Sequence, residues 1–293
     1  MARTPKIGPI RPPVEPAGDS QYTTARWFGG SPRRLLVPPR VTESDVATAA
    51  ATDCPAFSQS PPNNRIIAGL PSRELNHLKP HLQRISWHNG EIPIDVAARL
   101  DCFYFPEFGM VCTFAVMDDG RTVALAAIGR EGFLGVPAFF GAEIAQLRAV
   151  VVIDGDALRL GRDQLHRLLP VSPQFTAAMR RYSSRYLEQI AAIGACHALH
   201  NVPQRVASWM LIARDRTGSN LLPLTHESLG EVLGCRRASV TESLALLENA
   251  RIIRCARGQI SILDHRRLCQ WACECHVSVN NLRRTEFVRS CGI

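Results

Sequence analysis

The pattern of apolar and polar positions is most regular between Leu224 and Asp264, where it predicts two short helices followed by a hairpin. Before Gly234, apolar residues recur at the i, i+3, i+4 spacing of one helix face. These residues are Leu229, Val232 and Leu233. Thr225 precedes them at a position where its hydroxyl can cap the first turn. We therefore expect a helix that begins at about His226 and ends at Gly234.

A second helix is expected directly after Gly234. Its buried face is set by the i, i+4, i+7 series of Val240, Leu244 and Leu247. At about 100° per residue, the opposite face consists of Ala238, Thr241, Glu242 and Ala245. Arg236 and Arg237 stand in the first turn, from which long side chains reach past the helix end. Gly230 has no side chain where the two helices are expected to cross, as suits a helix-turn-helix pair.

The hairpin after the second helix completes a recognisable arrangement. Ile260 and Ile262 alternate with polar residues, and Arg257-Gly258 supplies the turn. The run LTHESLGEVLGCRRASVTESLALLENARII, together with this hairpin, resembles the winged helix-turn-helix of the Crp/Fnr superfamily of bacterial transcription regulators. The resemblance extends from about Asn64 to His276.

This resemblance implies that double-stranded DNA is the partner. In the family, the first, second and sixth residues of the recognition helix read base edges, and here these are Arg237, Ala238 and Glu242. Arginine can donate to guanine O6 and N7, and glutamate can accept from cytosine N4. Many family members have a glutamate in place of Ala238, so the half-site sequence does not transfer. The residues expected to contact phosphates are Arg236, Ser239, Thr241 and Arg257. The alternatives are solvated charge for Arg236 and Arg257, and an intrahelical partner for Glu242.

Between Gln83 and Leu160 the pattern changes to short apolar runs separated by turn residues. The clearest runs are Val111–Met117, Thr122–Ile128 and Ala149–Ile153. Many short strands with regular turns predict a β-sandwich or jelly roll. This part of the chain resembles the cyclic-nucleotide-binding fold of the same superfamily.

The nucleotide-binding signature of that fold is incomplete here. Gly135 matches the family's glycine, but Val136 stands where nucleotide-binding members have glutamate. Gln146-Leu147 falls near the position of the arginine that meets the cyclic phosphate, with Arg148 slightly beyond it. Because a buried phosphate needs a positive partner, we expect no binding of cyclic AMP, and the effector stays unknown. The alternative is an insertion or deletion that restores Arg148.

The longest regular helix is expected after Pro173. Its apolar stripe advances in steps of three and four residues, close to the heptad spacing of paired helices. The members are Phe175, Met179, Tyr182, Tyr186, Ile190, Ile193 and His197. We interpret the stripe as the seam of a homodimer, with burial against the β-domain as the alternative. A two-fold dimer would place two recognition helices about one DNA turn apart.

These patterns define an α+β chain. We expect a proline-rich disordered tail at 1–62, a jelly-roll effector domain at 63–172 and a dimerisation helix at 173–200. A winged helix-turn-helix at 201–277 and a C-terminal tail at 278–293 complete the chain.

Composition agrees with this interpretation and excludes some classes. The 293 residues suffice for two domains, and the formal charge of +8 suits a polyanionic partner. No apolar run approaches the ~18 residues of a membrane span, so we expect a cytoplasmic protein with no membrane partner. No nucleophile elbow, P-loop or zinc-protease motif is present, and we expect no enzymatic activity. RNA polymerase is a further partner to consider for a regulator of this kind.

The ten cysteines are scattered, which favours reduced thiols over a disulfide framework. Cys269, Cys273, Cys275 and His276 form a dense C-x3-C-x-C-H set, but the commoner C-x2-C metal signature is absent. We therefore favour buried small residues over a metal or iron–sulfur site and predict no metal or cofactor. Cys196 and His200 are explained equally well as seam or surface residues. A rival reading is a cyclic-nucleotide or redox-responsive receptor that acts through protein partners.

Overall fold

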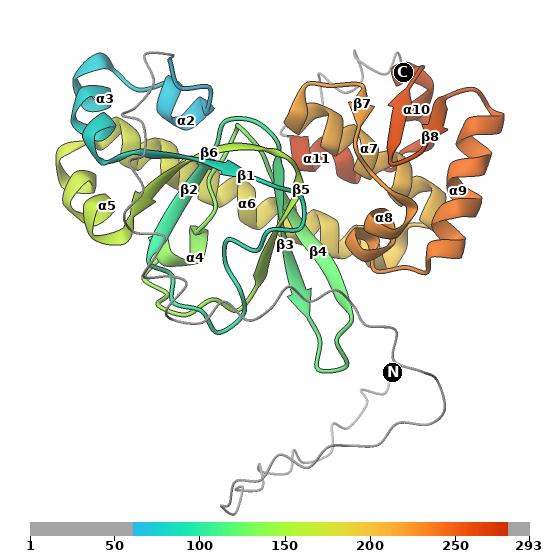
Figure 1. Cartoon of the computed structure of the whole chain (residues 1–293), viewed down its shortest axis with the longest axis horizontal. Coiled ribbons are helices and arrows are strands. Elements are labelled where there is room, and N and C mark those ends of the chain that lie inside the picture. The colour runs from blue at the N-terminus through green and yellow to red at the C-terminus, as the bar shows by residue number, and fades with distance from the viewer. Residues whose placement is uncertain (1–60, 281–293) are drawn as a thin grey trace, which may run out of the picture. The chain divides into compact units, whose positions relative to one another are not determined.

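The computed structural model describes residues 61–280 (Figure 1). Residues 1–60 of the proline-rich tail expected at 1–62, and residues 281–293 of the C-terminal tail expected at 278–293, lie outside the described residues. Within the described part, no helix has the length and apolar character that crossing a membrane requires.

The N-terminal domain is a β-sandwich, as expected. One sheet has the order β1-β6-β2 and the other β4-β3-β5, and all pairs are antiparallel. The strands are β1 (Gln83–Trp87), β2 (Cys102–Pro106), β3 (Met110–Val116), β4 (Thr122–Ile128), β5 (Arg148–Ile153) and β6 (Gly155–Gly161). Short helices border the sheets: α2 (Arg65–Ala68), α3 (Ser72–Leu78), α4 (Val136–Phe139) and α5 (Arg162–Leu168), with 3-10 turns η2 (Lys79–His81) and η3 (Leu169–Val171).

The core of this domain continues onto the long helix α6 (Pro173–Leu199). The Phe105 ring lies 5.9 Å from Phe175, and the Phe133 ring lies 5.2 Å from Tyr182, measured between centroids. Aromatic pairs at these distances stabilise a core beyond their area burial. The first half of α6 therefore belongs to the hydrophobic core of the β-domain (Figure 1).

This packing corrects the expected dimer seam. Phe175, Met179, Tyr182 and Tyr186 are all buried within a single chain, in the core of the β-domain. Ile193 is also buried, and Nε2 of His197 lies 3.1 Å from the carbonyl oxygen of Ala124 in β4. The heptad-like spacing reflects burial against the sheet. An apolar helix stripe has the same sequence pattern whether a sheet or a second helix covers it.

The C-terminal part has the expected helix pair and hairpin. Its elements are α7 (Val202–Thr217), β7 (Leu221–Leu222), α8 (His226–Leu233), α9 (Arg237–Asn249), β8 (Ile253–Ala256), β9 (Gln259–Ile262), α10 (His265–Trp271) and α11 (Cys275–Asn280). The sheet order is β7-β9-β8, so the hairpin β8–β9 is extended by β7, a strand too short to be evident in sequence. On β8, the amide of Cys255 donates to Oε1 of Glu248 in α9 at 2.8 Å.

Candidate DNA-binding site

The junction between α8 and α9 is set by residues close together in sequence. Thr225 and Ser228 form a capping box at the start of α8, and Gly234 ends the helix in the left-handed conformation at φ 58°. A Cβ atom at Gly230 would lie 3.1 Å from the carbonyl oxygen of Cys235. The close crossing expected at this glycine is therefore confirmed, and it brings the start of α9 against α8.

The outward face of α9 is the one expected from its period. Val240, Leu244 and Leu247 are buried, whereas Arg236, Arg237, Ala238, Thr241 and Glu242 are exposed. Ser239 is half-buried at the margin of this face. The exposed positions form one continuous surface that begins at the helix N-terminus.

The N-terminus of α9 has no cap of its own. Arg236 is the N-cap residue, no side chain accepts from the first amides, and no acidic residue stands in the first turn. Helix N-termini carry a partial positive charge and free N–H groups, so two arginines there are unfavourable in the isolated chain. The same end is well suited to an anion such as a phosphate group.

The turn of the wing lies close to this helix end. Arg237 and Arg257 line one surface hollow, together with His226 and Glu227 from the first turn of α8. Gly258 forms the wing turn at φ 75°. The structure thus brings together the residue expected to read bases and a residue expected to contact phosphate.

His226 belongs to this surface but was not identified from sequence. Its Nδ1 atom lies 2.9 Å from Oγ1 of Thr241, and that hydroxyl also donates to the carbonyl oxygen of Arg237 at 3.0 Å. The Thr241 hydroxyl is therefore engaged within the protein. The only sign of this role in the sequence is that His226 is a polar residue in the first turn of α8.

A buried polar link joins this helix pair to the β-domain. Arg205 in α7 donates through Nη2 to Nδ1 of His197 at 2.5 Å and to the carbonyl oxygen of Leu233, the last residue of α8. Burial, reinforced by the Arg205 charge, lowers the pKa of His197. A neutral His197 ring can accept from Arg205 and donate to Ala124 in β4. Strand β4, α6, α7 and the end of α8 are thus connected.

The β-domain contains a small apolar pocket beside Gly135 and Gln146-Leu147, where the sequence departs from the nucleotide-binding signature. It is lined by Ile94, Leu100, Thr113, Ile128, Leu134, Gly135, Val136, Pro137, Ala145, Gln146, Leu147, Ala149 and Tyr186. Its volume of about 30 Å³ has room for about two water molecules. Small-molecule pockets usually have at least ~300 Å³.

Arg148 does not line this pocket. It forms a two-pronged ion pair with Asp95, with Nε 2.7 Å and Nη2 3.3 Å from the carboxylate oxygens. Val136, at the position of the family's glutamate, is buried. The pocket therefore offers neither a carboxylate for a ribose nor a guanidinium for a phosphate.

A β-sandwich of this topology joined through a long helix to a winged helix-turn-helix defines a class of DNA-binding transcription regulators. Comparison with known families agrees: residues 84–170 match the cyclic nucleotide-binding domain, and residues 204–271 match the Crp-like helix-turn-helix domain. The chain belongs to the Crp/Fnr family, whose members regulate transcription by binding DNA.

Individual relatives are distant. The CRP-like cAMP-activated global transcriptional regulator of Mycobacterium tuberculosis is 24% identical over 71% of this chain and 96% of its own length. Among solved structures, FixK2 from Bradyrhizobium japonicum has a TM-score of 0.58 at 18% identity and covers 66% of this chain and 98% of its own. The c-di-GMP responsive regulator CLP of Xanthomonas campestris has a TM-score of 0.56 at 15% identity, over 66% of this chain and 99% of its own. At these identities the solved structures support the fold.

Proposed function

We propose that this regulator binds a near-palindromic DNA site as a homodimer, with α9 of each protomer in a major groove. Arg237, Ala238 and Glu242 read base edges. Arg236, Ser239 and Arg257 contact the backbone, joined by Thr241 once its hydroxyl turns from the carbonyl oxygen of Arg237 to a phosphate. The observation that carries the proposal is the uncapped N-terminus of α9, flanked by Arg236 and Arg237. A DNA phosphate supplies the negative charge that this helix end lacks.

The second protomer packs on the outer face of α6, since the inner face is already buried. Leu187 and Leu199 are 59% and 78% exposed on this helix. Ala191, Gly194 and Ala198 are also exposed. Small residues between exposed leucines allow two helices to approach closely over a two-fold axis.

The effector domain responds to something other than cyclic AMP. Its small pocket is lined by mostly apolar side chains, and it reaches α6 through the hydrogen bond between Tyr186 and Thr113, whose hydroxyl oxygens lie 3.1 Å apart. An input that favours one position of Tyr186 over another shifts the orientation of the helix pair, because a signal acts only through differential binding. Such a regulator acts in the cytoplasm, beside the chromosome, and RNA polymerase is the partner through which activation would proceed.

The test is genome-wide footprinting of the purified chain, followed by measurement of affinity for the recovered site. Arg237→Ala is expected to weaken specific binding by about 1–3 kcal/mol and to relax sequence preference at one base pair. Arg236→Ala is expected to weaken binding equally on all sequences. Unchanged preference in Arg237→Ala would remove that residue from base reading.

Salt dependence separates this function from a receptor that acts through protein partners. DNA affinity should fall on a log-log plot with a slope of about one unit per neutralised phosphate. Calorimetric titration with cyclic AMP is expected to show no saturable binding. Saturable binding of cyclic AMP would instead support the alternative in which Arg148 binds the cyclic phosphate.

A further inference from the structure

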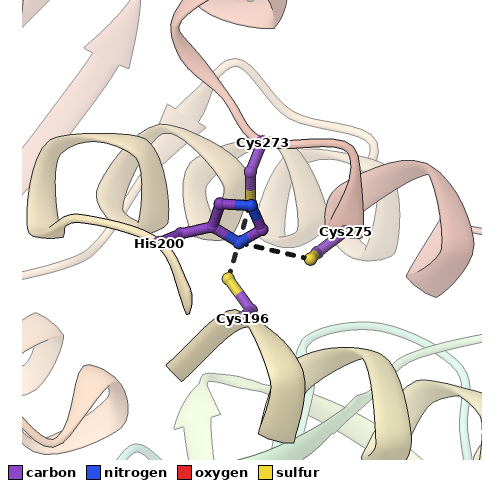
Figure 2. A group of neighbouring side chains, drawn as sticks. All are labelled: Cys196, His200, Cys273 and Cys275. Carbon is purple, nitrogen blue, oxygen red and sulfur yellow. Dashed lines mark hydrogen bonds between the residues drawn. The ribbon is translucent and has the colours of Figure 1, made fainter. Parts of the chain in front are cut away.

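Four potential metal ligands converge at the end of α6. Cys196 and His200 stand one helical turn apart, so their side chains lie on one face. Cys273 lies in the turn between α10 and α11, and Cys275 is the first residue of α11. Each residue offers one ligand atom, and the four atoms all lie within 4.8 Å of one another (Figure 2).

The separations suit a single tetrahedral ion. Zinc–sulfur bonds of ~2.3 Å and zinc–nitrogen bonds of ~2.0 Å place tetrahedral ligand atoms roughly 3.5–3.8 Å apart. The Sγ atoms of Cys196 and Cys273 are 3.4 Å apart, and Sγ of Cys275 is 3.6 Å from Nδ1 of His200. In Figure 2 the His200 ring lies among the three thiols. Small side-chain adjustments complete the tetrahedron.

The surroundings of the cluster resemble the second shell of a metal site. The thiols are shielded, with exposures of 7% for Cys196, 3% for Cys273 and 9% for Cys275. Nε2 of His200, the ring nitrogen that faces away from Cys275, lies 3.4 Å from Oε2 of Glu274. A carboxylate is one of the partners that commonly orient a metal-bound histidine through its second ring nitrogen.

Ser208 supports the central thiol. Its hydroxyl lies 3.0 Å from Sγ of Cys273, and it accepts from the Cys273 amide at 3.0 Å. These two hydrogen bonds fix the position of Cys273 beside Cys196.

We propose that Cys196, His200, Cys273 and Cys275 bind one zinc ion through three thiolates and Nδ1 of His200. Thiolate-rich tetrahedral sites select zinc over hard cations such as magnesium or calcium. All four positions are filled by protein, so the site is of the structural kind, with no open position for chemistry. Binding releases the thiol protons and involves no oxidation or reduction.

The ion would join parts of the chain that are far apart in sequence. Cys196 and Cys273 are separated by 77 positions. Zinc would fasten the end of α6 to the segment that begins α11, beside Ser208 of α7. The site therefore fixes the C-terminal segment of the DNA-binding part to the long helix.

The experiment is metal analysis of tag-free, full-length protein purified under reducing conditions and supplied with zinc. About one zinc per chain is expected in the wild type, and close to none in Cys273→Ser and His200→Phe. Cys235→Ser, which alters a half-buried cysteine outside the cluster, should keep its zinc. His200→Cys should also keep zinc, because it converts the site to four thiolates.

Cobalt provides an independent readout. Cobalt-loaded wild type should show the intense visible bands of a tetrahedral ion and thiolate charge-transfer absorption, and His200→Cys should shift both. Circular dichroism identifies any variant that fails to fold. If Cys273→Ser or His200→Phe does so, the shifted cobalt spectrum of His200→Cys still tests whether residue 200 is a ligand. Protein without metal, zinc that survives Cys273→Ser in a folded chain, or a Cys196–Cys273 disulfide in place of bound metal would each overturn the proposal.

Discussion

Arg216 and Glu131 form a buried ion pair, with Nε of the arginine 3.1 Å from Oε1 of the glutamate. The side chains are only 5% and 13% exposed. The guanidinium also donates to the carbonyl oxygens of Ala127, at 3.2 Å, and Val279, at 2.9 Å. One side chain of α7 thus holds β4, the turn that follows it and α11.

Arg216→Met is expected to destabilise the protein by about 3–5 kcal/mol, because it leaves Glu131 buried without its partner. The measurement is urea unfolding followed by tryptophan fluorescence. Arg121→Met is the matched control, because its ion pair with Asp119 is largely exposed, and it should leave the unfolding midpoint unchanged. The double variant Arg216→Met/Glu131→Gln should lose less free energy of unfolding than the sum of the losses in Arg216→Met and Glu131→Gln. Simple additivity would show that the pair is not coupled.

Gly234 is expected to tolerate no side chain, for two separate reasons. Its φ of 58° is unfavourable for other residues, and an added Cβ would lie 3.0 Å from Cγ2 of Val123 in β4. Gly218→Ala isolates the first effect, at about 1–2 kcal/mol, because φ there is 74° and nothing lies within 4 Å. Gly234→Ala should therefore lower the free energy of unfolding by more than Gly218→Ala. In a Val123→Ala background, Gly234→Ala should cost no more free energy of unfolding than Gly218→Ala. If the two glycine variants lose equal free energy with Val123 in place, the predicted clash with Val123 does not exist.

Leu187→Arg should convert the proposed dimer to a monomer, because it places a charge on the outer face of α6. Light scattering coupled to size-exclusion chromatography measures the mass directly. Met117→Arg is the control, since Met117 is also a large apolar residue, 48% exposed, but lies after β3 and is not part of α6. If the Leu187→Arg protein remains dimeric, the dimer interface does not lie on the outer face of α6.

Arg257→Gln should reduce the salt slope of DNA binding by about one unit and weaken all sequences alike, as expected for a phosphate contact. The slope is measured by fluorescence anisotropy over a range of salt concentrations. Arg73→Gln, an exposed change in α3 of the β-domain, should leave the slope unaltered. Loss of sequence preference in Arg257→Gln would instead make the wing a base reader.

Glu274→Gln should weaken zinc binding by about 10–100-fold while leaving the four ligands in place. Competition with a chromophoric chelator measures the affinity. Glu188→Gln, an exposed change on α6, serves as the control. Unaltered affinity in Glu274→Gln would show that the carboxylate does not orient His200.

The helix pair could be predicted from sequence, because the N-cap and terminal glycine of α8, the apolar period of each helix and the crossing glycine are all local. Thr225, Gly230 and Gly234 each play the part that their chemistry predicted. The dimer seam could not be read in the same way, since the burial of Tyr182 and Tyr186 depends on a sheet contributed by distant strands. The cluster around Cys273 was missed for a related reason. Its two halves, Cys196-His200 and Cys273-Cys275, are each unremarkable, and only the fold brings them together.

Glu248 limits the contacts that the edge strand of the wing can make with other proteins. In the sheet order β7-β9-β8, strand β8 is the open edge on the wing side, and a free row of amides there would invite pairing with another chain. The carboxylate of Glu248 occupies the Cys255 amide on that edge. Strand addition at this edge is thereby disfavoured, so another protein would meet the wing through side chains without extending its sheet.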